Sequence, residues 1–553
     1  MASWSYTYHS GVYPSRKASL LSPDLNVANK GDVMQSLIKL YHIESRQPSL
    51  GDNTGDLDRL KKVLCSSLQG QNPVVPFQRV APVAKAFRQS GFKGYAVVIH
   101  YPNGPQLVDF LAQAPETLVG LALDLGTTHI EASLVDLLSG KTLARGTVEN
   151  GQLEFGTDIL ARIHFAATKV GRQTGLDLLH ERVIASIHAL ALELTRRIRR
   201  KPGQIMALCV SGNTTMAHFF LKQNPHHLCR EPYIPVVNRP DPFSASELGL
   251  DLHPAAIVIV MPSIGSYFGG DLISGIIASG LDQQEETCML IDVGTNAEVV
   301  VGNRDWLIAC AGAAGPALEG GVARMGMRAG PGAIEHCTIY PDSGKVEYQT
   351  IGGASARGIC GSGVIDLVAG LYLARIIDIR GKFRANQPQA AGRLLEQQDG
   401  LAYVVVPSEE TDLGEPILLS QVDIDALMRS KAAMYSILAT ITNQVGVSFH
   451  DLHRIYVAGA FGKHISPRQA IILGMLPDLP LEVYTPLGNS SLAGAALMLI
   501  DDEARKRCTD VVAKVTYLEL NVNQEFMLRF SGSRIIPHTD HTLFPSVPFY
   551  GES

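Results

Sequence analysis

The feature that most constrains the fold is a short motif that occurs twice in the chain. "LALDLGTTHIEASLV" begins at Leu121 and "LIDVGTNAEVVV" begins at Leu290. Each consists of an apolar strand, the residues Asp-x-Gly-Thr, a polar position and a second strand-like run, a pattern typical of a buried β-hairpin. Because the motif returns at a matching place, the sequence predicts an internal repeat.

The elements around the two motifs repeat as well. From residue 118 onward, the periodicity predicts three strands, a helix, a strand and a helix, and the series restarts near residue 286. One of these helices is expected to run from Thr157 or Asp158 to Gly175. We therefore predict an α/β protein with two RNase H-like βββαβα halves after a small α/β domain. The predicted divisions are a tail (1–29), a small middle-type domain (30–117), a first half (118–285), a second half (286–505) and a C-terminal segment packed on them (506–553).

The composition excludes several classes of protein. A chain of 553 residues exceeds what one hydrophobic core usually holds, so more than one domain is expected. The net charge of −6 provides no whole-molecule attraction for nucleic acid. No apolar run approaches the roughly 18–20 residues of a membrane span, and the first residues lack the apolar core of a signal peptide. We expect a soluble, cytoplasmic protein.

The spacing of the cysteines argues against a metal cluster. The chain has eight cysteines, and none lies within three residues of another. This spacing excludes the local CxxC pattern of zinc sites and the close-spaced patterns of iron–sulfur centres. Several cysteines lie in apolar runs, where a buried free thiol is expected. The sequence therefore predicts no iron–sulfur cluster.

The repeated hairpin has the chemistry of a phosphate site. A glycine lets the backbone approach a ligand, and backbone N–H groups together with Thr or Asn side chains can donate to phosphate oxygens. A carboxylate beside phosphate repels it unless a cation lies between them, so Asp124 and Asp292 are the predicted Mg²⁺ ligands and part of the catalytic set. The predicted phosphate donors are Gly126, Thr127, Thr128, Gly294, Thr295 and Asn296.

Other strand ends and helix starts contribute further candidates. "VSGNTTM" places Gly212 and Asn213 at one strand end, and "VAGAFGK" places small residues at another, where a flat ring can lie against a helix start. Asp271 opens a helix, where it could orient water as a general base or act only as an N-cap. Glu298 faces either the cleft or solvent. The predicted adenosine loop contains Gly459, Ala460 and Gly462.

This arrangement resembles the superfamily of acetate and sugar kinases, Hsp70-type chaperones and actin. The resemblance covers nearly all of residues 118–553. It implies an ATPase fold in which two halves hold a nucleotide between a first phosphate loop at Asp124–Thr128, a second at Asp292–Asn296 and the adenosine loop at Gly459–Gly462. The implied cofactors are ATP and Mg²⁺.

A narrower resemblance follows from the amino-acid sequences of the loops. "GNTTMAHFFL", "GGDLISGIIASGL", "GMRAGPGAIE", "GICGSGVIDLVAGL", "LGNSSLAGA" and "PHTDHTLFPSV" are similar to blocks of the ATP-dependent reductive activators of corrinoid proteins. That family returns an inactive Co(II) corrinoid protein to Co(I). The resemblance implies a corrinoid protein of a methyltransferase system as partner, and we also expect a homodimer.

The chain departs from the family in its cysteines. Members carry an iron–sulfur centre, whereas this chain has one cysteine before residue 209 and one after residue 360. A separate ferredoxin-like protein is therefore expected to supply electrons. Two alternatives stay open: a small-molecule kinase of the same superfamily, and a nucleotide-gated, chaperone-like protein that binds the corrinoid protein.

Overall fold

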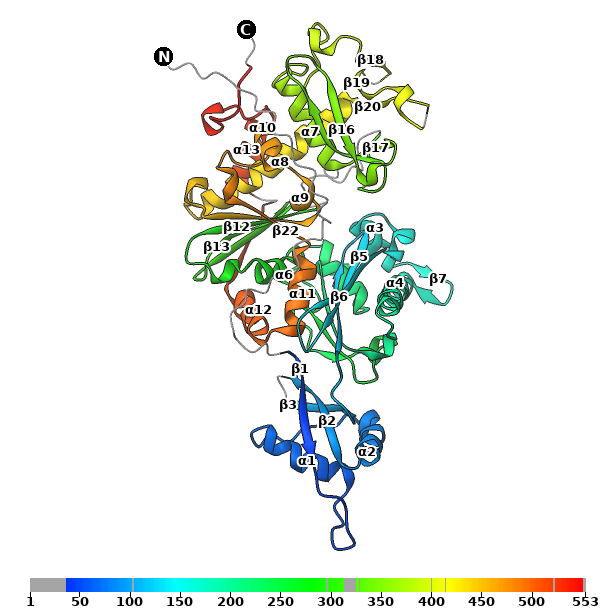
Figure 1. Ribbon diagram of the computed structural model, residues 1–553. Helices are drawn as coiled ribbons and strands as arrows, with labels where there is room; N and C mark the ends of the chain where they lie inside the picture. Colours follow the sequence, from blue (N-terminus) through cyan, green and yellow to red (C-terminus); the bar gives the residue numbers. More distant parts are fainter. Residues whose placement is uncertain are drawn as a thin grey trace.

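A computed structural model describes most of the chain. The described residues are 36–101, 104–294, 297–312, 325–327, 329–398, 400–412, 414–520 and 523–550. The predicted tail, residues 1–29, and two of the predicted phosphate donors, Thr295 and Asn296, lie outside them. The molecule is elongated, and its units follow one another along the long axis (Figure 1).

The first half is built on a six-stranded sheet in the order β10-β11-β9-β4-β5-β6. The strand with the first motif is parallel to β9 on one side and antiparallel to β5 on the other. Its side chains are almost all buried, as the apolar run predicts. The strands are β4 (Val119–Leu125), β5 (His129–Asp136), β6 (Thr142–Glu149), β9 (Ile205–Gly212), β10 (Phe243–Ser244) and β11 (Ile257–Val260), and the helices are α3 (Ile159–Ala166), α4 (Gly175–Arg197) and α5 (Thr214–Phe220).

The second half repeats this arrangement in the order β22-β21-β12-β13-β14-β23. The strand with the second motif is parallel to β21 and antiparallel to β13, as β4 is to β9 and β5. The strands are β12 (Cys288–Val293), β13 (Ala297–Gly302), β14 (Leu307–Gly312), β21 (Arg454–Ala458), β22 (Tyr484–Gly488) and β23 (Val515–Leu518). The helices are α8 (Gln421–Gln444), α9 (Gly459–His464), α10 (Pro467–Leu473), α12 (Asp502–Lys514) and α13 (Gln524–Gly532). The matching topology confirms the predicted α/β fold class with two equivalent halves.

Two helices cross between the halves. They are α6 (Gly270–Ser279) and α11 (Ser490–Ile500), which pack against each other. Helix α6 contacts β9 of the first sheet and β12 of the second, and α11 contacts β4 and β9. Figure 1 shows the pair between the two sheets. The start of each helix therefore lies where strands of the two halves end.

A unit that the sequence did not predict is inserted between β14 and α8. It contains two three-stranded sheets and one buried helix, and it forms the upper end of the molecule in Figure 1. Its elements are β15 (Ala333–Ile339), β16 (Val346–Thr350), β17 (Gly358–Ile359), α7 (Gly361–Leu373), β18 (Leu394–Gln397), β19 (Gly400–Val406) and β20 (Ile417–Ser420). The residues of α7 are largely apolar, and the helix is buried nearly all round.

The N-terminal unit forms the opposite end of the molecule (Figure 1). Its sheet has the order β1-β2-β3 and packs with two helices around a separate small core. The backbone N–H of Leu37 donates to the carbonyl of Leu499 at the end of α11, 3.1 Å away. The elements are β1 (Ile38–Glu44), α1 (Asp56–Ser67), α2 (Val80–Gln89), β2 (Lys93–Tyr101) and β3 (Gly104–Leu111). The domain boundaries given above stay predictions.

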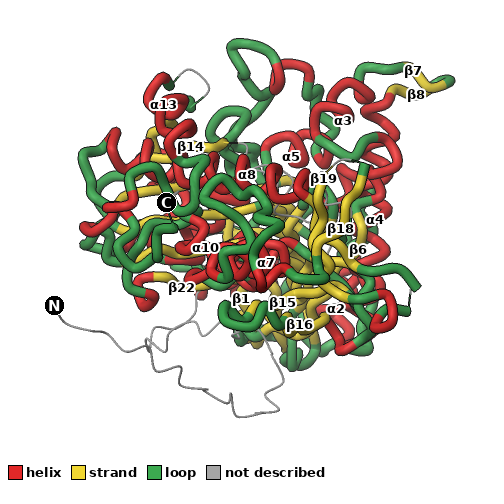
Figure 2. The backbone as a smooth tube through the Cα atoms, turned by 90° about the horizontal axis from the view of Figure 1, so that it is seen from above, coloured by secondary structure: helices red, strands yellow, loops and turns green. Residues whose placement is uncertain are grey.

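The helix predicted from Thr157 or Asp158 to Gly175 is wrong in its second half. Asp158 does cap α3, but that helix ends at Ala166. A hairpin of β7 (Lys169–Val170) and β8 (Gln173–Thr174) follows and projects from the body in Figures 1 and 2. The apolar spacing stops at Ala166, and Gly171 takes the left-handed conformation (φ 64°) that a tight turn needs. Gly175 then begins α4.

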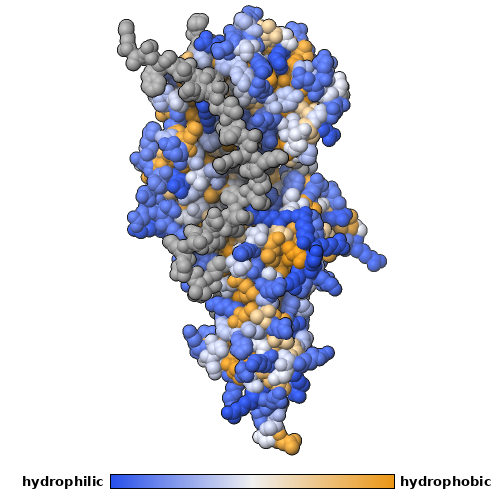
Figure 3. All heavy atoms as spheres, viewed as in Figure 1, coloured by the Kyte–Doolittle hydropathy of each residue, from blue (hydrophilic) through white to orange (hydrophobic). Residues whose placement is uncertain are grey.

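On the face shown in Figure 3, hydrophobic patches are separated by hydrophilic side chains. Among the described residues, no helix is both long and apolar enough to cross a membrane.

Candidate nucleotide site between the two hairpins

The first hairpin places Asp124 near the end of β4, opposite Glu131 of β5. The turn is tight, because a Cβ on Gly126 would lie 2.5 Å from the carbonyl oxygen of His129. Any other residue would force the turn open. Gly126, Thr127 and Thr128 form the tip, as predicted, and all three are partly exposed.

The carboxylate of Asp124 is held by residues from the other end of the chain. The Asn489 Nδ2 group donates to its Oδ2 at 2.8 Å, and the Ser491 hydroxyl donates to its Oδ1 at 2.7 Å. Burial raises the pKa of Asp124 to about 7; the Ser491 and Asn489 hydrogen bonds lower it, and the charges of Glu131 and Asp271 raise it. A negative charge here is therefore costly unless a cation is bound.

The second hairpin repeats the arrangement. Asp292 of β12 lies opposite Glu298 of β13. Burial raises the pKa of Asp292 to about 7, and the charges of Asp271 and Asp124 add to the rise, while the Ser490 hydroxyl lowers it. Burial also raises the pKa of Glu298 well above its usual range, with the charges of Asp271 and Asp292 as further causes. Glu298 therefore faces the other carboxylates.

Asp271 lies at the second residue of α6, and the N-cap position belongs to Gly269. The backbone N–H of Leu272 donates to the Asp271 Oδ1 at 2.9 Å. Burial raises the pKa of Asp271 to about 6. A carboxylate with a pKa near neutrality is suited to accept a proton, as a general base must.

These four carboxylates converge from both halves, since the charge of one raises the pKa of another. Among the described residues, however, no three His, Cys, Asp or Glu side chains are placed to hold a metal ion by themselves. Mg²⁺ prefers oxygen ligands and commonly uses one or two carboxylates together with water and substrate phosphates. The donor set therefore fits Mg²⁺ bound jointly with a nucleotide.

The other predicted residues surround the same place. Asn213 follows Gly212 at the end of β9 and caps α5, and its Nδ2 lies 3.4 Å from the Thr127 hydroxyl. Gly459 opens α9 with φ 74°, and a Cβ on it would lie 2.8 Å from the Asp292 Oδ1. Ala460 and Gly462 lie in the same helix, and Gly294 follows β12.

The residues that hold Asp124, namely Asn489 and Ser491, were not predicted from the sequence. Asn489 also donates to the Glu131 Oε2 at 3.0 Å. The Ser491 hydroxyl further contacts the Ser211 hydroxyl at 2.9 Å, which contacts that of Ser274 at 2.8 Å. The block "LGNSSLAGA" contains Asn489 and Ser491. Its polar residues before an apolar run indicate the start of a helix, and this was the sequence signal that could have pointed to them.

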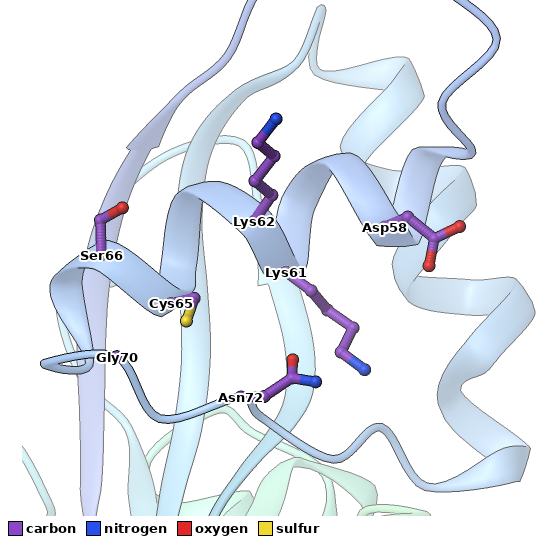
Figure 4. Close-up of a pocket in the computed structure, with 7 residues that line it drawn as sticks. All are labelled: Asp58, Lys61, Lys62, Cys65, Ser66, Gly70 and Asn72. Carbon is purple, nitrogen blue, oxygen red and sulfur yellow. The ribbon is translucent and has the colours of Figure 1, made fainter.

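A separate hollow of about 430 Å³ lies on α1, in the N-terminal unit. Figure 4 shows that the side chains of Lys61 and Lys62 point in different directions around it. The lining does not converge on a common point, and the hollow lies away from the hairpins, so we assign it no function. Its lining residues are Asp58, Lys61, Lys62, Cys65, Ser66, Gly70 and Asn72.

Comparison with known families matches nearly the whole chain. The model described as the C-terminal domain of RACo, the ASKHA domain, matches residues 286–548. The model of the RACo middle region matches residues 119–284, and that of the RACo linker region matches residues 29–116.

Individual relatives agree with these family models. A solved structure named reductive activator for corrinoid, iron–sulfur protein is 37% identical, has a TM-score of 0.85, and aligns over 94% of this chain and 82% of its own. The corrinoid activation enzyme RamQ of Eubacterium limosum is 28% identical over 93% of this chain and 86% of its own length. A Co(II) methylated amine-specific corrinoid protein reductase of Methanosarcina barkeri is 26% identical over 72% of this chain and 73% of its own. The resemblance inferred from the loops is confirmed.

Proposed function

Because the chain belongs to the family of reductive activators of corrinoid proteins, we propose that it uses ATP to return a Co(II) corrinoid protein to Co(I). The observation that carries the ATP part is the convergence of Asp124, Asp271, Asp292 and Glu298 between two phosphate-type hairpins. These carboxylates are half-buried, and a cation beside them favours their charged form; a nucleotide complexed with Mg²⁺ supplies one.

In the proposed reaction, the N–H and hydroxyl groups of the two hairpins hold the phosphates, and α9 lies beside the adenosine. Asp124 and Asp292 would hold Mg²⁺, which neutralises phosphate charge when it is bound. Asp271 accepts a proton from the attacking water while the water oxygen bonds to the γ-phosphorus. The bond from that phosphorus to the bridging oxygen breaks, giving ADP and phosphate.

The reduction needs one electron for each cobalt. We propose that a separate ferredoxin-like protein is oxidised by one electron while Co(II) becomes Co(I). The role of ATP is to shift the population of conformers: a nucleotide that binds one arrangement of the halves more tightly favours that arrangement. Helix α6, which contacts β9 of the first half and β12 of the second, is placed to transmit the change.

The test is steady-state ATP hydrolysis with Mg²⁺, alone and with a Co(II) corrinoid protein and a low-potential donor, while cobalt absorption is recorded. The proposal predicts that hydrolysis rises with the partner and that Co(I) appears only with ATP and donor together. The variant Asp271→Asn should bind ATP but form no Co(I).

Other outcomes would identify a different function. ATP-dependent binding of the corrinoid protein without reduction would favour a nucleotide-gated binding protein, an alternative supported by the wide spacing of the cysteines. Transfer of phosphate to a small metabolite would indicate a kinase. Either result would contradict the proposed activation.

A further inference from the structure

Behind the first hairpin lies a cluster of buried polar side chains that the proposed reaction does not use. Asn150, Gln152 and Arg162 each have no exposed surface. They come from the segment after β6 and from α3. Buried polar groups of this size are costly unless their hydrogen bonds are made, so their partners indicate what they do.

The cluster holds three successive carbonyl groups of the hairpin tip. The Asn150 Nδ2 donates to the carbonyl of Gly126 at 2.9 Å, and the Arg162 Nη2 donates to that of Thr127 at 2.6 Å. The backbone N–H of Asn150 donates to the carbonyl of Thr128 at 2.9 Å. All three carbonyls therefore point into the protein, toward one cluster.

The orientation of the N–H groups follows from peptide geometry. In a trans peptide, the N–H of the next residue points away from the carbonyl. With the carbonyls of Gly126 and Thr127 turned inward, the N–H groups of Thr127 and Thr128 are turned to the opposite side of the loop. Within the described part of the chain, neither N–H has a hydrogen-bond acceptor. Free donors of this kind bind anions.

Arg162 also places a positive charge behind the loop. Its remaining hydrogen bonds go to neutral acceptors: the carbonyl of Gly156 at 2.8 Å, the Gln152 Oε1 at 3.3 Å and the Met216 Sδ at 3.5 Å. Burial lowers the pKa of Arg162 to about 10, and the charge of Asp158 opposes that shift, so the guanidinium is charged at neutral pH. Because no carboxylate contacts it within the described residues, its field is available to a phosphate group at the tip.

We propose that Arg162 is a positioning residue, which orients the first phosphate loop and supplies positive charge for the outer phosphates of ATP. This inference rests on the proposed function, in which the hairpin binds those phosphates. It assigns a role to a side chain that does not touch the nucleotide. Asn150 and Gln152 stabilise the same loop. Asn150 donates to a carbonyl of the hairpin tip, and Gln152 orients the guanidinium of Arg162.

The test compares ligands that differ only in their outer phosphates. Dissociation constants of Mg·ATP and of AMP are measured for the wild type, Arg162→Lys and Gln152→Glu. The lysine variant keeps the charge, but one ammonium group cannot donate to all four acceptors of the guanidinium. The glutamate variant keeps an acceptor for Arg162 and neutralises its charge, while it loses the Nε2 donor to the Leu179 carbonyl. We expect Mg·ATP to bind at least about tenfold more weakly to both variants, with AMP affinity within about twofold of the wild type.

The matched control is Arg182→Gln. Arg182 is about half exposed and pairs with Glu154 in the same region, so its loss should leave both affinities unchanged. Wild-type affinity for Mg·ATP in both variants, or equal losses for ATP and AMP, would overturn the inference while the proposed function stands. A wild-type protein that binds no ATP would overturn both.

Discussion

The two hairpins are built from equivalent strands and carry the same motif, but their aspartates contact different kinds of neighbour. The oxygens of Asp124 accept from Asn489 and Ser491, which follow β22 and therefore belong to the second half. Asp292 instead has Gly459, a residue of its own half, packed beside it. The repeat thus provides two copies of a phosphate loop. The aspartate of the first copy is bound by residues from a distant part of the chain, and that of the second lies against a residue of its own half. Because α11 packs on β4 and β9, the contacts of Asp124 join a late segment of the chain to the first sheet.

The largest effect is expected from Asp292→Asn. This change removes a charge at the proposed cation site without removing a bond between the halves. We expect ATP hydrolysis to fall by on the order of 100-fold, the size typical of losing one electrostatic group at a reacting phosphate. The Mg²⁺ concentration needed for half-maximal hydrolysis should rise. An unchanged metal dependence would show that Asp292 is not at the cation site.

The next effect concerns the close approach of Gly459 to Asp292. Gly459→Ala adds a Cβ about 2.8 Å from the carboxylate, at φ 74°. We expect nucleotide binding to weaken by roughly 1–3 kcal/mol from strain and lost space. Gly446→Ala is the control, since Gly446 has φ 67° and its added Cβ meets no atom. Equal nucleotide affinity in the two variants would contradict the packing argument.

A smaller effect is expected from Asn489→Ala, which acts on the first hairpin. Asn489 donates to the charged form of Asp124, so its removal should raise the pKa of Asp124 further. More alkaline pH is then needed to ionise the carboxylate. The acid limb of the pH–rate profile should move upward, with a loss of roughly tenfold at pH 6.5 and less at pH 8.5. A uniform loss at all pH values would indicate a structural role alone.

The smallest effect is on stability in the absence of nucleotide and Mg²⁺. The folded-state pKa values of Asp124 and Asp292 are raised to about 7, so the protonated forms stabilise the folded protein. This contribution is fully present below the unfolded-state pKa of roughly 4 and is lost as the pH rises through about 7. The unfolding temperature should therefore fall by a few degrees between pH 5.5 and pH 8. Asp292→Asn should reduce this fall, and a flat profile in the wild type would contradict the raised pKa values.

The sequence predicted those parts of the fold that are locally encoded. Asp124 and Asp292 could be placed because each lies near the end of its own buried strand. The holders of Asp124 could not, since Asn489 and Ser491 are brought to it only by tertiary folding. The inserted unit was missed because strands such as β16 and β18 are short and largely open to solvent, which weakens their alternation. Arg162 looked like any arginine of an amphipathic helix until its burial was known.

In the proposed reaction, both hairpins hold one and the same nucleotide. The most direct measurement is a double-mutant cycle on the dissociation constant of Mg·ATP for the wild type, Asp124→Asn, Asp292→Asn and the double variant. Two aspartates at one site should give strongly non-additive changes, with a coupling of at least about 0.5–1 kcal/mol. Additive changes would contradict the account, because they would mean that the two hairpins act at independent sites.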